Sequence, residues 1–159
     1  MATYSISPAS GTAGHPSKAP DLKCVSVVVD FSSTTNSSGD IFQCITLPAN
    51  TYVVTAGIDV ITADTDGNSG TIALGDGADV DRYISTAATT SAGLMSIRAQ
   101  AGAGAMGTTS IGYGIYAATD TIDMVISTGA VNCVVRVFAL TADFNGYVGD
   151  SDGQVVTFA

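Results

Sequence analysis

The chain has 159 residues, of which 46% are hydrophobic and only 12% are charged, and its formal net charge at pH 7 is −9. This composition is too apolar for a disordered protein, and the length suits one domain with a single core. No apolar run approaches the roughly 18 residues of a membrane-spanning helix, and the five basic residues are too scattered to bind a phosphate backbone. We therefore expect neither a membrane nor a nucleic acid as a partner.

The acidic residues are all Asp, and eighteen glycines are spread along the chain. Asp side chains bond to nearby backbone groups and favour turns, whereas Glu favours helix interiors. This bias indicates strands joined by many turns.

Residues 1–22 carry three prolines among small polar residues and are typical of an extended arm. Such an arm is either disordered or ordered against an adjacent subunit. It lacks the charged start and apolar centre of a signal peptide, so we expect the chain to be made in a cytoplasm without export by that route.

Alternation of apolar and polar residues predicts a first strand over 23–31, followed by a polar loop and a second strand over 41–47. The turn at Pro48-Ala49-Asn50 predicts a hairpin with the next strand, 51–62. In that strand the residues expected to face the core are Tyr52, Val54, Ala56, Ile58 and Val60.

Shorter strands are expected at 71–74 and 80–84 on either side of a Gly-Asp-Gly turn, with an exposed connection from 85 to 93. A strand at 94–98 and a Gly/Ala-rich loop follow, and glycines alternate with apolar residues over 111–115. Two further strands, 121–127 and 131–141, show inward apolar faces. Residues 143–159 are more apolar than a solvated tail requires and indicate a second, docking arm.

About eight strands without an amphipathic helix predict an all-β fold, an antiparallel β-sandwich of jelly-roll type over residues 23–142 between the two arms. An immunoglobulin-like strand order is the alternative, because alternation does not determine which strands pair.

The segment Asp64-Thr65-Asp66-Gly67-Asn68 has the opening rhythm of a calcium loop, with oxygen ligands at Asp64, Asp66 and Asn68. The glycine and the Glu that such a loop needs later are missing, and a tight turn accounts for the same residues. Asp79 and Asp81 would add carboxylates to such a calcium site only if their loop and the loop of Asp64 lay close together.

Other chemistries lack essential parts. Cys24, Cys44 and Cys133 are widely spaced, so we expect free, mostly buried thiols and no zinc site. The single histidine, His15, lies in the first arm, which leaves no base for a catalytic triad. Paired carboxylates for glycoside hydrolysis need a cleft, and the G-x-G-x-x-G over 102–107 lacks a following helix. We therefore expect no catalytic residues, no metal and no cofactor, and structural roles for the tyrosines.

The stretches VTAGIDVITADTDGNSGTIALGDGADVDRYISTA and DTIDMVISTGAVNCVVRVFALTADF, with the glycine-rich tail, resemble small virion structural proteins of tailed bacteriophages, particularly head decoration or cement proteins. The resemblance extends over residues 25–144 in arrangement and contains no residue-level motif. It implies a β-rich homotrimer on the outer surface of an expanded capsid, where extended termini clamp neighbouring major capsid subunits.

The leading hypothesis is therefore a non-enzymatic capsid decoration protein of the virion. The alternatives are a tail, fibre or head-vertex component, or a carbohydrate- or calcium-binding β-sandwich module.

Overall fold

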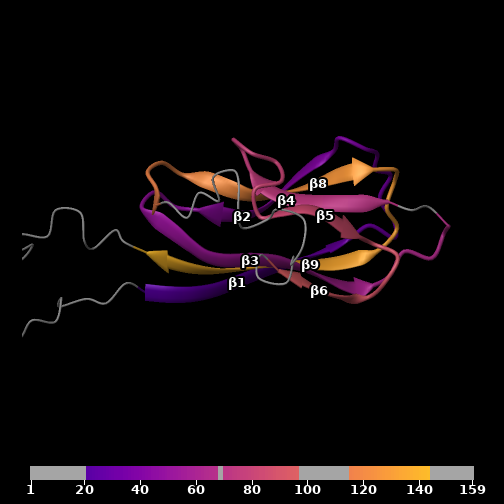
Figure 1. Ribbon diagram of the computed structural model, residues 1–159, viewed down its shortest axis with the longest axis horizontal. Helices are drawn as coiled ribbons and strands as arrows, with labels where there is room; N and C mark the ends of the chain where they lie inside the picture. The colour runs from indigo at the N-terminus through magenta and orange to yellow at the C-terminus, as the bar shows by residue number, and fades with distance from the viewer. Residues whose placement is uncertain (1–20, 68–69, 97–114, 144–159) are drawn as a thin grey trace, which may run out of the picture.

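The computed structural model describes residues 21–67, 70–96 and 115–143, which form nine β-strands in two antiparallel sheets (Figure 1). In the first sheet the order is β1 (Asp21–Asp30), β9 (Val134–Asp143), β3 (Thr51–Thr62) and β6 (Gly93–Ser96), and the short β7 (Ile115–Tyr116) also pairs with β3. In the second sheet the order is β2 (Ile41–Leu47), β8 (Asp120–Thr128), β4 (Thr71–Asp76) and β5 (Ile84–Ala88). The predicted all-β sandwich is confirmed.

The strand pairings are nested. β1 pairs with β9, β2 with β8, β3 with β6, and β4 with β5. The chain thus resembles one long hairpin wound so that its strands are shared between two sheets, which is the jelly-roll arrangement. An immunoglobulin-like order would place the first two strands side by side in one sheet, whereas β1 and β2 lie in different sheets.

The hairpin predicted at Pro48-Ala49-Asn50 is wrong, because β2 and β3 belong to different sheets. The turn carries the chain from one layer to the other, and Asn50 adopts the left-handed conformation there with φ of 60°. Both strands can then direct apolar side chains into the same core from opposite sides.

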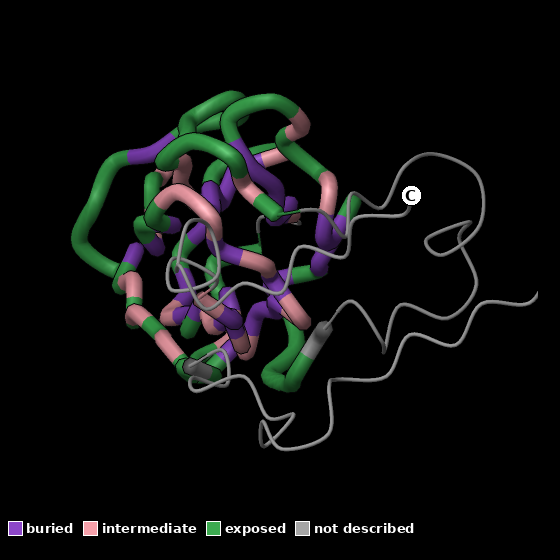
Figure 2. Tube along the Cα trace, turned by 90° about the vertical axis from the view of Figure 1, so that its left-hand side faces the viewer, coloured by how far each residue is buried: buried purple, intermediate pink, exposed green. Residues whose placement is uncertain are grey.

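The core lies between the sheets, where Figure 2 shows buried segments inside and exposed loops at the rim. Alternate residues of β8 and β9 face inward as predicted, and each fully buried aliphatic side chain stabilises the fold by about 1.5–3 kcal/mol. The largest fully buried apolar side chains are those of Leu47, Ile58, Ile72, Leu74, Ile84, Ile122, Met124, Ile126, Val135 and Val137.

The inward face predicted for β3 is correct only in its second half. The register with β9 shifts between Val53 and Thr55, so one extra residue is inserted in β3. Such a bulge reverses which residues face the core. Val53 is buried before it and Ile58 after it, while Tyr52 is only half-buried.

The strand predicted at 80–84 begins later, because residues 77–83 form a wide turn and β5 covers Ile84–Ala88. The Asp76 carboxylate stabilises this turn, since its Oδ1 accepts hydrogen bonds from the amides of Ala78 (3.0 Å) and Asp79 (2.8 Å). The connection predicted from residue 85 is wrong over residues 85–88, because they belong to β5; Ala87 is buried, whereas Ser85, Thr86 and Ala88 are exposed as predicted.

The described residues contain no helix long and apolar enough to cross a membrane.

Candidate interaction surface

The sandwich has two lateral sides at which sheets end, with β1 and β2 on one side and β5 and β6 on the other. Proteins protect such edges with short strands, bulges, charges or proline. β6 has four residues, and the registers of β2 and β5 with their neighbours shift. Three of the four edges are therefore short or irregular.

β1 is long and regular, and its charged residues, Asp21, Lys23 and Asp30, lie near its two ends. Its ten residues pair with β9 without a register shift, from Asp21 opposite Asp143 to Asp30 opposite Val134. The sequence from Cys24 to Val29 contains no charge and no proline. Within the described residues β1 is thus the edge best suited to accept a further strand.

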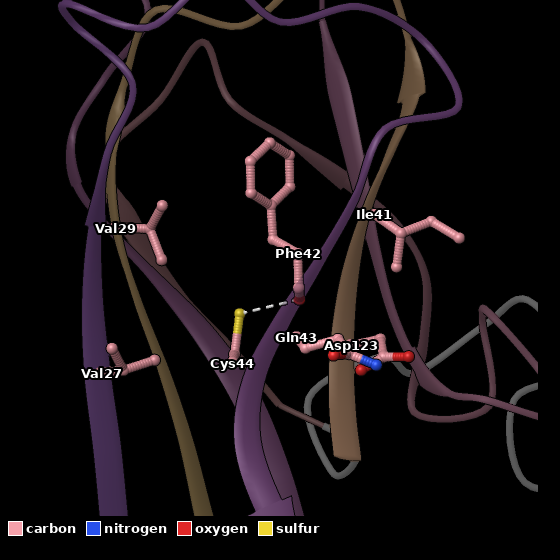
Figure 3. A pocket seen from close by; sticks show the side chains of 7 residues that line it. All are labelled: Val27, Val29, Ile41, Phe42, Gln43, Cys44 and Asp123. Atoms are coloured by element: carbon pink, nitrogen blue, oxygen red, sulfur yellow. Dashed lines mark hydrogen bonds between the residues drawn. The ribbon is translucent and has the colours of Figure 1, made fainter.

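A groove of about 650 Å³ opens between β1 and β2 (Figure 3). Val27 and Val29 of β1 extend toward Phe42 and Cys44 of β2, and all four side chains are half-buried. The groove is lined by Val27, Val29, Ile41, Phe42, Gln43, Cys44 and Asp123. Its inner wall is apolar, and partners with small aliphatic or aromatic groups would fit it.

Aromatic packing supports one residue of the groove wall, Phe42. The buried ring of Phe31 meets Phe42 edge to face, with ring centroids 5.0 Å apart and an interplanar angle of 79°. This geometry is favoured by the ring quadrupoles and fixes the Phe42 side chain in the wall.

The outer rim adds apolar surface. Leu22 is 66% exposed, Val28 53% and Ile41 55%. Single exposed aliphatic residues are ordinary, but here they flank a groove and an unpaired edge on one side of the molecule. Together these residues, β1 and the groove form what we call the β1 surface.

Cys44 lies at the register shift in β2, and its Sγ donates to the carbonyl oxygen of Phe42 at 3.2 Å. Burial is the main reason that its pKa is raised to about 11, so the thiol is neutral at pH 7. The three described cysteines are free, as predicted. Cys133 is buried, but the expectation of burial is wrong for Cys24, whose side chain lies on the solvent face of β1.

Asp123 of β8 lies beside Gln43, away from the apolar wall (Figure 3). It is buried, and its Oδ1 has no hydrogen-bond partner. Burial above all, and then the charges of Asp120 and Asp76, raise the pKa of this carboxyl. A single carboxylate in this position forms neither a metal site nor a catalytic pair.

A second polar cluster escaped sequence analysis. Asp76 is 1% exposed, its Oδ2 accepts a hydrogen bond from Tyr116 Oη at 2.6 Å, and Tyr116 Oη also bonds to Tyr83 Oη. Arg82 Nε lies 2.5 Å from the same Oδ2, but its N–H is not aimed at that oxygen, so the contact is ionic. Burial raises the pKa of Tyr83 to about 12, which keeps the phenol protonated. The cluster joins β7 to the β4–β5 turn, which is a structural role.

The residues considered as calcium ligands, Asp64, Asp66 and Asn68, either make other contacts or lie outside the described residues. Asp64 is buried, and its Oδ1 and Oδ2 accept hydrogen bonds from the amides of Asp66 (3.2 Å) and Asn132 (2.9 Å). The carboxylate therefore ties its loop to the connection between β8 and β9. Asn68 lies outside the described residues.

No group of three or more His, Cys, Asp or Glu side chains in the described part of the chain could hold a metal ion. Asp79 and Asp81 interact with each other, and their hydrogen bond raises the pKa of Asp81. His15, the glycine motif at 102–107, and most of both predicted arms lie outside the described residues.

Comparison with solved structures finds the same fold in phage capsids. The chain is similar to one from the "Capsid of Ralstonia phage GP4", at 17% identity and a TM-score of 0.56, over 86% of this chain and 90% of that one. It is also similar to one from the "Cyanophage Pam1 capsid asymmetric unit", at 18% identity and a TM-score of 0.50, over 86% of this chain and 99% of that one. The likeness shows a shared fold. No protein-family model and no curated protein matches the sequence.

Proposed function

We propose that this chain is a virion structural protein, a decoration protein that binds the outer surface of a tailed-phage head as a homotrimer and stabilises the shell. The observation that supports this most is the fold shared with chains from two phage capsids, which extends over 86% of this chain in both cases. The alignments also span 90% and 99% of the matched chains, so the likeness involves nearly the whole of each chain.

The charge of the chain favours the outside of a head. A net charge of −9 opposes close contact with packaged DNA, whose phosphates are also negative. On the outer surface the same charge keeps the free protein soluble before it binds. The major capsid protein is then the main partner.

Stabilisation would follow from mass action. A protein that binds the expanded shell, but not the opened or dissociated states, lowers the free energy of the closed shell relative to those states. Residues 1–22 and 143–159 would act as arms that extend the contact beyond the sandwich. Extended arms add contact area without enlarging the core.

The test is the number and position of copies in purified virus particles, measured by gel stoichiometry and cryo-electron microscopy of the head. We expect many copies in clusters of three across the outer shell. A few copies at a vertex or in the tail would replace decoration by the alternative virion role. Absence from particles would refute both.

A direct assay uses heads that lack the protein. Purified protein added to expanded heads should bind saturably and raise their melting temperature, whereas unexpanded heads prepared in the same way serve as the control. Binding without any change in head stability would contradict the stabilising role.

A further inference from the structure

The β1 surface offers hydrogen-bonding groups as well as apolar side chains. In an antiparallel pair the backbone groups of alternate residues point away from the partner strand. Along the edge that faces away from β9, the N–H and C=O groups of β1 are therefore not paired with any described strand. A strand added at this edge would satisfy these groups and would also place every second side chain over the groove.

We infer that the β1 surface binds the C-terminal segment, residues 144–159, of a second copy of this chain. The inference rests on the homotrimer of the proposed function and specifies its contact. The segment contains Val155-Val156-Thr157-Phe158, which are residues favoured in strands, and it has no proline and no basic residue. The sequence before them, from Gly149 to Gly153, consists of Gly, Asp and Ser.

The chemistry of the groove fits such a strand. Val156 and Phe158 are two residues apart, so they lie on the same side of an extended segment. Their side chains would meet the apolar wall formed by Val27, Val29 and Phe42. The backbone hydrogen bonds with β1 would give affinity, and the groove would select apolar side chains at alternate positions.

The path of the chain favours a second copy over the same copy. β9 ends at Asp143, which pairs with Asp21 at the beginning of β1, whereas the groove lies farther along β1 at Val27 and Val29. To reach its own groove, the segment would have to turn around the start of β1, the end at which the chain enters this strand. Connections that cross one another at the same edge of a sheet are avoided in proteins.

The length of the segment is sufficient for exchange between molecules. Sixteen extended residues reach at most about 53–58 Å, while the ten residues of β1 span about 33 Å. Each copy would give its segment to one neighbour and receive a segment from another. This heterologous contact closes a ring when the rotation between copies matches, as in a trimer.

Cys44 in the groove wall provides the readout. In a Cys24→Ser background, Cys44 is the accessible described thiol, because Cys133 is 1% exposed. We compare the rate at which a maleimide labels Cys44 in the full-length protein and in the full-length double variant Val156→Asp/Phe158→Asp. A groove occupied nine-tenths of the time reduces the labelling rate about tenfold, so the double variant should react about ten times faster.

A matched control adds the same two charges outside the strand. The double variant Asn145→Asp/Ser151→Asp should label as slowly as the parent and should keep its oligomeric state, measured by sedimentation. Dilution of the parent to monomer should release Cys44, and a synthetic peptide of residues 144–159 should protect it again in a chain that ends at Asp143.

Equal labelling rates for the parent and the Val156→Asp/Phe158→Asp variant would overturn the inference. It would also be overturned if the control variant Asn145→Asp/Ser151→Asp labelled as fast as the Val156→Asp/Phe158→Asp variant. Protection that persists in a proven monomer would assign the groove to the segment of the same copy. Head binding is measured separately. Protein that binds heads without Cys44 protection refutes this inference alone, and Cys44 protection without head binding refutes the proposed function alone.

Discussion

Replacement of Asp76 by Ala should destabilise the sandwich more than any other single acid-to-Ala change in the described chain. Four groups bond to or pair with this buried carboxylate: two turn amides at 3.0 and 2.8 Å, Tyr116 Oη at 2.6 Å and Arg82 Nε at 2.5 Å. The side chain of Arg82 is itself only 20% exposed, and its ion pair among the described residues is with Asp76, so the substitution would remove that pair from a largely buried charge.

Removal of one partner from a buried ion pair costs about 3–5 kcal/mol. The hydrogen bonds lost from Tyr116 and the turn overlap with that cost and are not added to it, because contacts in one network are not independent. For a chain of this size, about 1 kcal/mol corresponds to a shift of about 2–4 °C in melting temperature. We therefore expect a decrease of about 6–20 °C.

The assay is urea unfolding followed by circular dichroism, with thermal melting as a second measurement. The control is Asp81→Ala, an exposed acid whose removal relieves contact with Asp79 and should change stability by less than about 0.5 kcal/mol. A double-mutant cycle with Arg82→Ala measures the coupling directly. A loss below about 1 kcal/mol for Asp76→Ala would refute the importance assigned to this cluster.

Three further predictions follow from the same coordinates. Gly75→Ala should lower the free energy of unfolding by about 1–3 kcal/mol or prevent folding, because the added Cβ would lie 2.0 Å from the carbonyl oxygen of Asp79. In Gly77→Ala the added Cβ would meet a side-chain oxygen of Asp120 at 3.1 Å, so this variant should lose less stability in the same unfolding assay. The pKa of Asp123 is raised in the folded state, so its ionisation opposes folding, and its contribution to stability falls as pH rises from the ordinary Asp pKa through the folded pKa. Asp123→Asn removes this downward contribution and should raise the melting temperature at pH 7 but not at low pH, where the parent carboxyl is protonated. A lower melting temperature at pH 7 would contradict this. Calcium and a chelator should leave the melting temperature unchanged because Asp64 is bonded to two backbone amides, and a saturable increase with calcium would contradict that assignment.

The sequence alone was sufficient to predict the inward face of those strands in which the alternation of apolar residues matches the burial. In β8, Ile122, Met124 and Ile126 alternate with other residues and are fully buried, as predicted. In β3 the pattern continues through an inserted residue at the bulge, and only pairing with β9 reveals that Tyr52 lies on the other face. Alternation carries no information about such register shifts.

The position of β5 could not be read from its residues. Its sequence, Ile84-Ser-Thr-Ala-Ala88, has one large apolar residue and looks like a connection. The wide turn held by Asp76 determines where the strand begins, and this depends on contacts with Tyr116, forty positions away. The same long-range contacts explain why a cluster of Asp, Arg and two Tyr was not recognised.

The candidate surface was predictable only in part. The alternation of Val25, Val27 and Val29 was visible, but β1 becomes an edge only because the strand order places β9 on one side and no described strand on the other. Edge position is a property of strand pairing and not of local sequence.

The nested pairing of the strands has a consequence for folding speed. β1 and β9 pair residues more than a hundred positions apart, and among the neighbouring strands only β4 and β5 form a pair that is local in the sequence. Chains dominated by such distant contacts fold slowly, within about milliseconds to seconds, because loop closure precedes the contacts that compensate for it. Until β9 has paired, β1 and β3 each lack the strand with which they share the most residue pairs. During that time the uncharged run from Cys24 to Val29 can pair with other chains that have not finished folding. High expression at elevated temperature should therefore favour aggregation through this run, and slow synthesis should favour the native sandwich.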